Sequence, residues 1–154
     1  PEEDLATIGL EYHSSDMKMS DVPIRANLWD LAAFDRNGTW VKMFYPSCLG
    51  IFLCFDITDR DSFDSLSEKL GTIREYGPKI IKIILVGTKC DLTYKRRVSY
   101  SQALKWAEDK GIKYIEISTK DNISIQQAYR TLIDDILTID SEDFKKFREG
   151  LRRK

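Results

Sequence analysis

Hydrophobic and polar positions alternate in the first part of the chain, which predicts two antiparallel strands. Residues 24–29 place apolar side chains on one face and polar side chains on the other, with the period of two that a half-buried strand has. A partner strand is predicted over about residues 8–19, joined to the first by a turn near Ser20-Asp21. We therefore expect a β-hairpin in this part of the chain.

Two later runs, residues 51–55 and 80–86, are almost wholly apolar instead of alternating. This pattern is typical of parallel strands that are covered on both faces. Helical spacing follows, with apolar faces made of Phe63, Leu66, Leu70 and Ile73 in one helix and of Ile125, Ala128, Leu132 and Ile136 in the last. Ser99 and Gln102 form a capping box, which predicts the start of a further helix between these two helices. The alternation predicts a three-layer α/β fold that binds its ligand at the carboxyl ends of the strands.

Two predicted strands end in polar residues with candidate chemistry. Residues 83–86 run into Gly-Thr-Lys-Cys-Asp, and a second strand ends in Ser-Thr-Lys at residues 118–120. A carboxylate such as Asp91 accepts both the N1–H and the exocyclic amine of guanine, whereas adenine lacks the N1–H. Lys89 is expected to lay its methylene stem along the base, with its ammonium in water. Together the two turns predict a guanine-selective site, although either one alone is also compatible with an ordinary polar strand exit.

Composition indicates one small globular domain. The 154 residues are 42% hydrophobic with a formal net charge of −1, so the chain can bury a core and no nucleic-acid partner is indicated. Three cysteines, an odd number, favour reduced thiols over a disulfide framework. No apolar run approaches the roughly 20 residues that a membrane-spanning helix needs. We expect a cytoplasmic protein.

Three segments resemble, in order and spacing, the switch segments and fourth strand of the Ras superfamily. They are Thr-Ile-Gly-Leu-Glu-Tyr at residues 7–12, Leu-Trp-Asp-Leu-Ala-Ala at residues 28–33, and residues 55–63, which begin Phe-Asp-Ile-Thr-Asp. The resemblance points to the Rab branch and runs from about residue 7 to about residue 137. It implies a three-layer Ras-like P-loop NTPase fold with a mixed, mostly parallel sheet. Residues 1–139 would form the G domain and residues 140–154 a charged C-terminal extension.

One signature of that family has no counterpart in this sequence. A Ras-type domain begins with a strand leading into Gly-x-x-x-x-Gly-Lys-Ser/Thr, which holds the phosphates and Mg²⁺, and the 154 residues contain no such motif. The missing first strand would lie between the strand ending at Asp30 and the strand at residues 51–55. About 8 backbone groups would lose partners there at about 1–3 kcal/mol each, which rivals a net stability of about 5–15 kcal/mol. We expect a fragment of a longer protein, or else a gap filled by a neighbouring strand, a partner or closed-up pairing.

The resemblance assigns roles to individual residues. The guanine-binding set comprises Thr88, Lys89, Asp91, Ser118, Thr119 and Lys120, with Thr88 in place of the usual asparagine. Thr7 and Asp30 would hold Mg²⁺, although both are compatible with ordinary strand positions. Ala33 stands where the family has the glycine that contacts the γ-phosphate, and Phe34 replaces the glutamine that orients the attacking water. Phenylalanine cannot position a water molecule, so we expect no catalytic residue and very slow or absent GTP hydrolysis.

Aromatic residues mark a candidate surface for partner proteins. Tyr12, Trp29 and Phe44 stand where Rab proteins place an aromatic triad that effectors contact, and Phe34 and Trp40 would add exposed aromatic area. Trp29 and Phe44 are equally compatible with core positions. The implied ligands are GTP or GDP with Mg²⁺, and the implied partners are effector and regulator proteins.

The C-terminal residues leave two structural alternatives open. Phe144, Phe147 and Leu151 have helical spacing among lysines and arginines, which fits a solvated extension or a short amphipathic helix that docks on the domain or on an anionic membrane. No prenylation cysteine ends the sequence, so membrane association is not supported by the C-terminus present. Peripheral attachment to endomembranes is expected only if the native C-terminus is longer.

Three functional hypotheses follow. The first is a Rab-like GTP-binding switch in intracellular vesicle traffic with impaired hydrolysis. The second is a pseudo-GTPase, an interaction module that neither binds nor hydrolyses nucleotide. The third is an unrelated flavodoxin-like enzyme, which would need an anion-binding loop after a strand, and none of the strand exits offers one.

Overall fold

The computed structural model describes residues 10–19, 21–31 and 39–153 and divides the chain into two compact units. The first unit, Pro1–Met43, contains a two-stranded antiparallel sheet, and the second, Phe44–Lys154, contains a three-stranded parallel sheet with its helices. The short helix α1 (Thr39–Phe44) ends at the boundary between them.

The sheet of the first unit is the predicted hairpin. Strands β1 (Leu10–Met19) and β2 (Val22–Leu31) pair in unbroken register along their whole length. In the connecting turn, Asp21 has a φ of 65°, a left-handed conformation that aspartate tolerates. β2 begins two residues before the predicted strand because Pro23 is acceptable in a strand whose outer edge needs no backbone donor.

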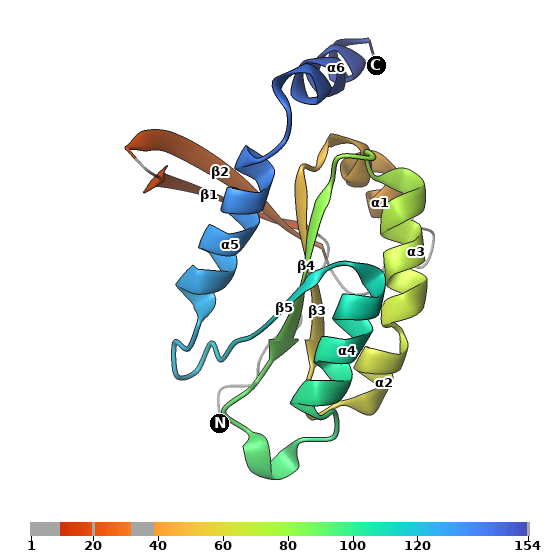
Figure 1. The fold of residues 1–154 in the computed structure, drawn as a ribbon, viewed down its shortest axis with the longest axis vertical. Helices are drawn as coiled ribbons and strands as arrows, with labels where there is room; N and C mark the ends of the chain where they lie inside the picture. Colours follow the sequence, from red (N-terminus) through yellow and green to blue (C-terminus); the bar gives the residue numbers. More distant parts are fainter. Residues whose placement is uncertain (1–9, 20, 32–38, 154) are drawn as a thin grey trace. The chain divides into compact units, whose positions relative to one another are not determined.

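The second unit is organised around a parallel sheet with the strand order β3-β4-β5 (Figure 1). Its strands are β3 (Gly50–Asp56), β4 (Lys82–Thr88) and β5 (Lys113–Glu116). β4 is the middle strand, and Ile84 and Leu85 at its centre are fully buried, as the apolar run predicts. Within the described residues β3 pairs with β4 alone and is therefore an edge strand.

Helices cover both faces of this sheet (Figure 1). The helices are α2 (Arg60–Asp64), α3 (Leu66–Tyr76) and α4 (Tyr100–Lys110) on one face and α5 (Ile125–Leu137) on the other. Leu85 packs in the same core as Leu66 of α3, whereas Ile84 and Val86 pack with Leu132 of α5. Neighbouring residues of β4 thus pack into the cores on opposite faces of the sheet. The predicted three-layer α/β fold is confirmed.

Local side-chain bonds explain where two of the helices begin. The Ser99 hydroxyl accepts a hydrogen bond from the Gln102 amide at 3.2 Å, which confirms the predicted capping box at the start of α4. The apolar spacing over residues 63–73 belongs to two helices instead of one. They meet at Ser65, whose hydroxyl donates to the carbonyl of Ser62 at 2.9 Å and so competes with regular helix bonding.

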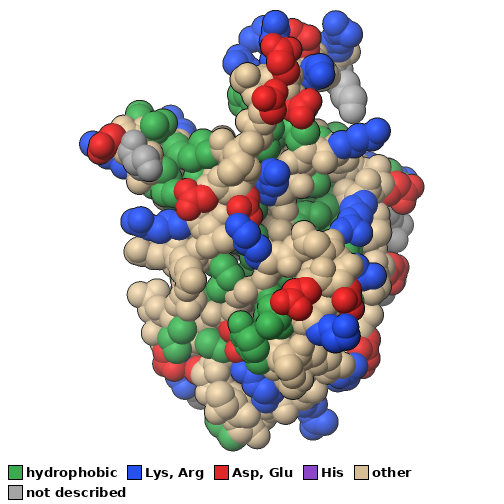
Figure 2. Space-filling view, in the orientation of Figure 1, with side chains coloured by type: hydrophobic (Ala, Val, Ile, Leu, Met, Phe, Trp, Pro, Cys, Tyr) green, Lys and Arg blue, Asp and Glu red, His purple; other side chains and the backbone are tan. Residues whose placement is uncertain are grey.

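The C-terminal segment forms α6 (Ser141–Arg152). It begins where the Asp140 carboxylate accepts a hydrogen bond from the Glu142 amide at 2.8 Å. None of its residues is buried, and Figure 2 shows side chains of both charges over this helix. The segment is therefore helical and solvated at once. Among the helices of the described ranges, none is both long and apolar enough to cross a membrane.

A close approach at the end of α3 generates the first prediction. A Cβ at Gly77 would lie 2.6 Å from the backbone oxygen of Ile73, which cannot move without disrupting the last turn. We expect Gly77→Ala to lower the free energy of unfolding by about 1–3 kcal/mol. At Gly71 a Cβ would meet nothing within 4 Å, so Gly71→Ala should raise it by about 0.5–1 kcal/mol. Urea denaturation of both variants measures the two effects, and effects of the same sign would contradict this account.

Candidate functional site

The candidate site lies at the carboxyl ends of β4 and β5, where two loops leave the sheet. Backbone pairing continues just past the strands, because the Ile117 amide donates to the Gly87 carbonyl at 2.8 Å and the Cys90 amide donates to the Ile117 carbonyl at 3.1 Å. Lys89 has a φ of 60°, which turns the chain out of the sheet. The two polar strand exits singled out in the sequence are therefore joined directly.

A hydrogen bond between side chains holds the predicted guanine acceptor. Ser118 is fully buried, and its hydroxyl donates to Asp91 Oδ1 at 2.7 Å while accepting from the Asp121 amide at 3.1 Å. An ionised carboxylate has about four lone-pair positions. Among the described residues no group donates to Asp91 Oδ2, so the carboxylate is fixed in place and keeps acceptor capacity. This arrangement fits the paired donors of a guanine base.

The loop that supplies Ser118 is closed on itself. Ser118 and Ile123 exchange backbone hydrogen bonds of 3.2 and 2.9 Å, which form an isolated antiparallel bridge. Asn122 has a φ of 54°, a left-handed conformation that asparagine tolerates. Thr119 and Lys120 are exposed within this closed turn. The structure thus brings all six predicted guanine-binding residues to the carboxyl edge of the sheet, with Thr88 at the end of β4.

Lys89 departs from its expected position. Its ammonium forms an ion pair with Asp56 Oδ2 at 2.8 Å instead of extending into water, and 52% of the side chain remains exposed. The other oxygen of Asp56 accepts bonds from the amide and hydroxyl of Thr58 at 2.8 and 2.7 Å. Burial raises the pKa of Asp56, but the bonds from Lys89 and Thr58 outweigh burial and hold this pKa below its usual value. The lysine head is thereby anchored to the end of β3.

Thr88 also ties two strands together. Its hydroxyl donates to the carbonyl of Phe55 at 3.1 Å, across from β4 to β3. The threonine that replaces the asparagine of the family thus forms a specific bond between neighbouring strands, which secures the base of the loop.

A partly buried ionic network behind the site was not found from the sequence. Arg96 donates from both terminal nitrogens to the two carboxylate oxygens of Glu116, at 2.7 and 2.8 Å. Tyr114 donates to the same carboxylate at 2.6 Å, and Arg96 also reaches the carbonyl of Val98 at 3.1 Å. The network joins the loop after β4 to β5. The one signal in the sequence is Glu116, a charged residue at the end of the apolar part of β5, because a partly buried carboxylate there requires a cationic or hydrogen-bonding partner.

Titration of this network follows from burial and pairing. Burial raises the pKa of Glu116, but hydrogen bonds from Arg96 and Tyr114 outweigh burial and lower the pKa overall. Burial, followed by the bond to Glu116, raises the pKa of Tyr114. β4 packs closely against this network at Gly87, because a Cβ at that position would lie 2.7 Å from the Tyr114 hydroxyl.

The predicted partner-binding aromatics fall in both units. In the hairpin, Tyr12 and Trp29 face each other across the two strands with ring centroids 4.6 Å apart, and they are 49% and 41% exposed. Trp29 is therefore not a core residue. The Tyr12 hydroxyl donates to Asn27 at 2.9 Å, which fixes the ring. Phe44 is half-buried at the start of the second unit.

The remaining predicted positions are less completely described. Asp30 is exposed near the end of β2, opposite Glu11 in the register. Thr7, Ala33 and Phe34 lie outside the described residues, as does the side chain of Trp40. In the described part of the chain, no group of three or more histidine, cysteine or carboxylate side chains is arranged to hold a metal ion. Asp30 is thus the one predicted Mg²⁺ ligand whose position is known.

Comparison with known proteins gives the family. The model of the Ras family matches residues 1–138 of this chain. The chain belongs to the Ras family. Bovine (Bos taurus) Ras-related protein Rab-8B is 33% identical over 134 residues, which cover 87% of this chain and 65% of Rab-8B. Mouse (Mus musculus) Rab-8A is 34% identical over 132 residues, 86% of this chain and 64% of Rab-8A. Dog (Canis lupus familiaris) Rab-13 is 32% identical over 133 residues, 86% of this chain and 66% of Rab-13.

These matches confirm the predicted resemblance to the Rab branch of the Ras superfamily. This Ras-family chain spans about two thirds of the length of the Rab proteins that it matches, 65% for Rab-8B. The match also agrees with the α/β architecture of the second unit, in which a parallel sheet carries the candidate site at its carboxyl edge.

The ionic network of this Ras-family chain generates the second prediction. Because the folded-state pKa of Glu116 is lowered, its contribution to stability is present above the unfolded pKa of about 4.3 and is lost as the pH falls through the folded pKa. Arg96→Met removes the paired cation and should lower the free energy of unfolding by about 1–3 kcal/mol at pH 7. The deficit should shrink below about pH 4, where Glu116 becomes protonated.

Urea denaturation at pH 7 and pH 3 measures this difference. Lys105→Met is the matched control, since Lys105 and Asp109 form an exposed pair whose side chains are 77% and 60% accessible. Such a pair is worth about 0–1 kcal/mol. An Arg96→Met deficit of equal size at both pH values would contradict the assignment of stability to the ionised Glu116.

Proposed function

We propose that this chain belongs to a Rab-like small GTP-binding protein that acts as a guanine-nucleotide switch in intracellular vesicle traffic, and that its GTP hydrolysis is impaired. The proposal depends on one observation above all. The Asp91 carboxylate is fixed by the buried Ser118 hydroxyl at the carboxyl edge of the sheet and retains acceptor capacity.

The chemistry of that carboxylate selects among purines. Guanine presents N1–H and an exocyclic amine side by side, and both can donate to the oxygens of Asp91. Adenine offers no N1–H, so it would leave the acceptor without a partner, which is a large penalty in a partly buried site. The half-exposed stem of Lys89, whose head is anchored on Asp56, supports stacking against the base.

The rest of the nucleotide would be held by residues outside the base site. GTP or GDP would bind with Mg²⁺, for which Thr7 and Asp30 are the candidate ligands in this chain. Effectors and regulators would contact the exposed pair of Tyr12 and Trp29, with Phe44 as the third aromatic residue. The protein would act in the cytoplasm, with peripheral attachment to endomembranes only if the native C-terminus is longer.

Impaired hydrolysis is inferred from two residues of the second switch segment. Phe34 has no polar atom that could orient the attacking water, and Ala33 has less backbone freedom than the glycine of the family. Both features would slow the chemical step without affecting recognition of the base.

A pseudo-GTPase is the second candidate function. The observation that favours it is the aromatic pair in the hairpin, since Tyr12 and Trp29 expose 49% and 41% of their surfaces while their rings remain in contact. Rigid, exposed aromatic residues are typical anchors of protein interfaces. In this alternative the hairpin would bind partners irrespective of nucleotide.

The base site generates the third prediction, which concerns Asp91→Asn. The amide donates one hydrogen bond where guanine also presents a donor, so affinity for fluorescently labelled GDP should fall about 10- to 100-fold, equivalent to about 1.4–2.8 kcal/mol. Xanthine presents a carbonyl in place of the exocyclic amine and should be preferred by the variant. Equilibrium titrations with the GDP and XDP derivatives measure both changes.

Asp109→Asn makes the same chemical change on the exposed surface of α4 and should leave both affinities unaltered. Failure of the unmodified chain to distinguish guanine from adenine and xanthine nucleotides would exclude base recognition by Asp91. That outcome would favour the pseudo-GTPase.

The fourth prediction concerns hydrolysis in the full-length gene product. Ala33→Gly combined with Phe34→Gln should raise the single-turnover rate of phosphate release about 10- to 100-fold, because a residue that positions the reacting water is restored. Ala32→Gly is the control, since it adds backbone freedom next to the site without a polar group. An unmodified protein that already hydrolyses GTP as fast as the double variant would defeat the proposal of impaired hydrolysis.

A further inference from the structure

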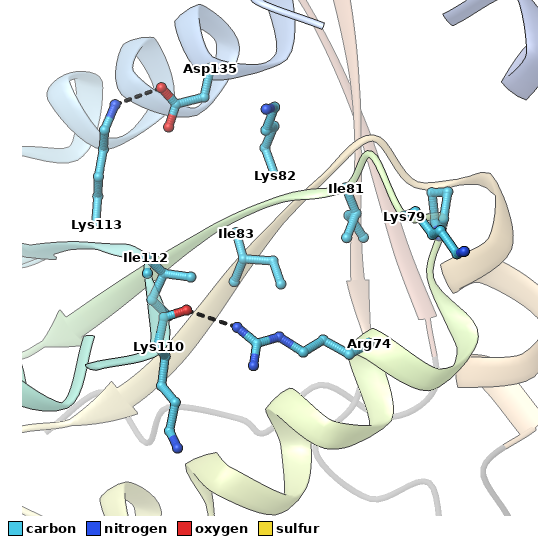
Figure 3. Close-up of a pocket in the computed structure, with 11 residues that line it drawn as sticks. Arg74, Lys79, Ile81, Lys82, Ile83, Lys110, Ile112, Lys113 and Asp135 are labelled. Atoms are coloured by element: carbon cyan, nitrogen blue, oxygen red, sulfur yellow. Dashed lines mark hydrogen bonds and ion pairs between the residues drawn. The ribbon is translucent and has the colours of Figure 1, made fainter. Parts of the chain in front are cut away.

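A hollow lined by cationic side chains lies at the edge of the parallel sheet opposite the base site. It has a volume of about 570 Å³ and is found where α3 and α4 end and where β4 and β5 begin. Its charged lining consists of Arg74, Lys79, Lys82, Lys110 and Lys113 together with one carboxylate, Asp135 (Figure 3). We propose that this basic hollow is a second binding site, and that its ligand is a small molecule or headgroup that carries several phosphate groups.

The charges in the basic hollow are not balanced by the protein. Asp135 is already paired with Lys113 at 2.6 Å, which leaves four cations without a carboxylate in the lining. Of these, Lys79, Lys82 and Lys110 form no ion pair within the described part of the chain. The whole sequence has 24 cationic and 25 acidic residues, so five cations with one acid is a local concentration of charge. Like charges gathered in a concave surface attract anions.

One member of the cluster is held in position. The Arg74 guanidinium donates to the backbone carbonyl of Lys110 at 2.8 Å, which joins the ends of α3 and α4 (Figure 3). A guanidinium has five N–H donors, so this bond leaves others for a ligand. Arginine and lysine are also the side chains that proteins use to bind phosphate, through paired donors and through a compact charge respectively.

Helix electrostatics explains only part of the cluster. Arg74 and Lys110 lie in the last turns of α3 and α4, where cations are favourable opposite the negative end of the helix dipole. Lys79 lies in the loop that follows α3, and Lys82 and Lys113 are the first residues of β4 and β5. Lys113 is already paired with Asp135, but Lys79 and Lys82 have neither helix carbonyls to stabilise nor an ion pair within the described residues, so an external anion is the simpler account for these two.

The floor of the basic hollow limits the kind of ligand. Ile81, Ile83 and Ile112 line it between the cations (Figure 3). The volume is in the range of about 300–1,000 Å³ that is typical of small-molecule sites. An apolar floor within a ring of cations fits a compact carbon skeleton with phosphates around its rim. Such a group occurs both in free polyphosphates and in phosphorylated lipid headgroups, and the experiment below separates these sources.

Inositol hexakisphosphate is the probe, titrated by calorimetry into the full chain at 150 mM salt. The combined variant Lys79→Gln, Lys82→Gln and Lys110→Gln should bind it at least about 10-fold more weakly, since three charge-assisted bonds are lost. Lys69→Gln, Lys105→Gln and Lys146→Gln removes the same charge from exposed positions outside the hollow and should bind as the unmodified chain does. Asp91→Asn should also retain binding, because the base site lies at the other edge of the sheet.

Equal weakening in the two triple variants, or no binding by the unmodified chain, would overturn the proposal. Lys79→Glu in the exposed loop serves as a second variant if the first fails to fold, and its binding should likewise weaken. Phosphatidylcholine vesicles containing phosphatidylinositol bisphosphate form the second arm. Vesicle binding that is lost in the hollow variant identifies a lipid headgroup as the source of the phosphates, and binding of the soluble probe alone identifies a free polyphosphate.

Discussion

Burial of β4 on both faces is the constraint on which the second unit depends. Leu85 packs into the core beneath α3, and Ile84 and Val86 pack into the core beneath α5, so no face of the strand can be left in water. Parallel neighbours on both sides satisfy its backbone, and parallel strands bring all their carboxyl ends to one edge. The meeting of the loops after β4 and β5 is therefore a consequence of core formation.

At that edge, two carboxylates have different roles because their hydrogen-bond partners differ. Both carboxylate oxygens of Glu116 accept hydrogen bonds from Arg96, and Tyr114 donates a third. The charge of Glu116 is therefore paired within the protein, and this pairing joins β5 to the preceding loop. Asp91 receives one bond from Ser118 and keeps the rest of its acceptor capacity. Selective recognition requires an acceptor that is held rigidly and still has lone pairs free. A fixed carboxylate cannot rearrange to form hydrogen bonds with the wrong ligand.

The same topology gives the sheet two chemically different ends. A helix that precedes a parallel strand ends where that strand begins, so the C-termini of α3 and α4 collect at the amino edge, together with the cations Arg74 and Lys110 that suit helix ends. The acceptor Asp91 is at the carboxyl edge. A ligand at either edge would not exclude a ligand at the other sterically.

The sequence alone determined the hairpin, the apolar strands, the capping box at Ser99 and the meeting of Asp91 with the turn at Ser118, because each depends on local periodicity or on the rule that parallel strands end together. It also determined the family, since motif order and spacing are properties of the sequence itself. Only the tertiary structure decided that the head of Lys89 is bound to Asp56 and that Arg96 is paired with Glu116. These partners lie 20 or more residues apart, and which charges meet depends on the path of the loops, which no local pattern encodes.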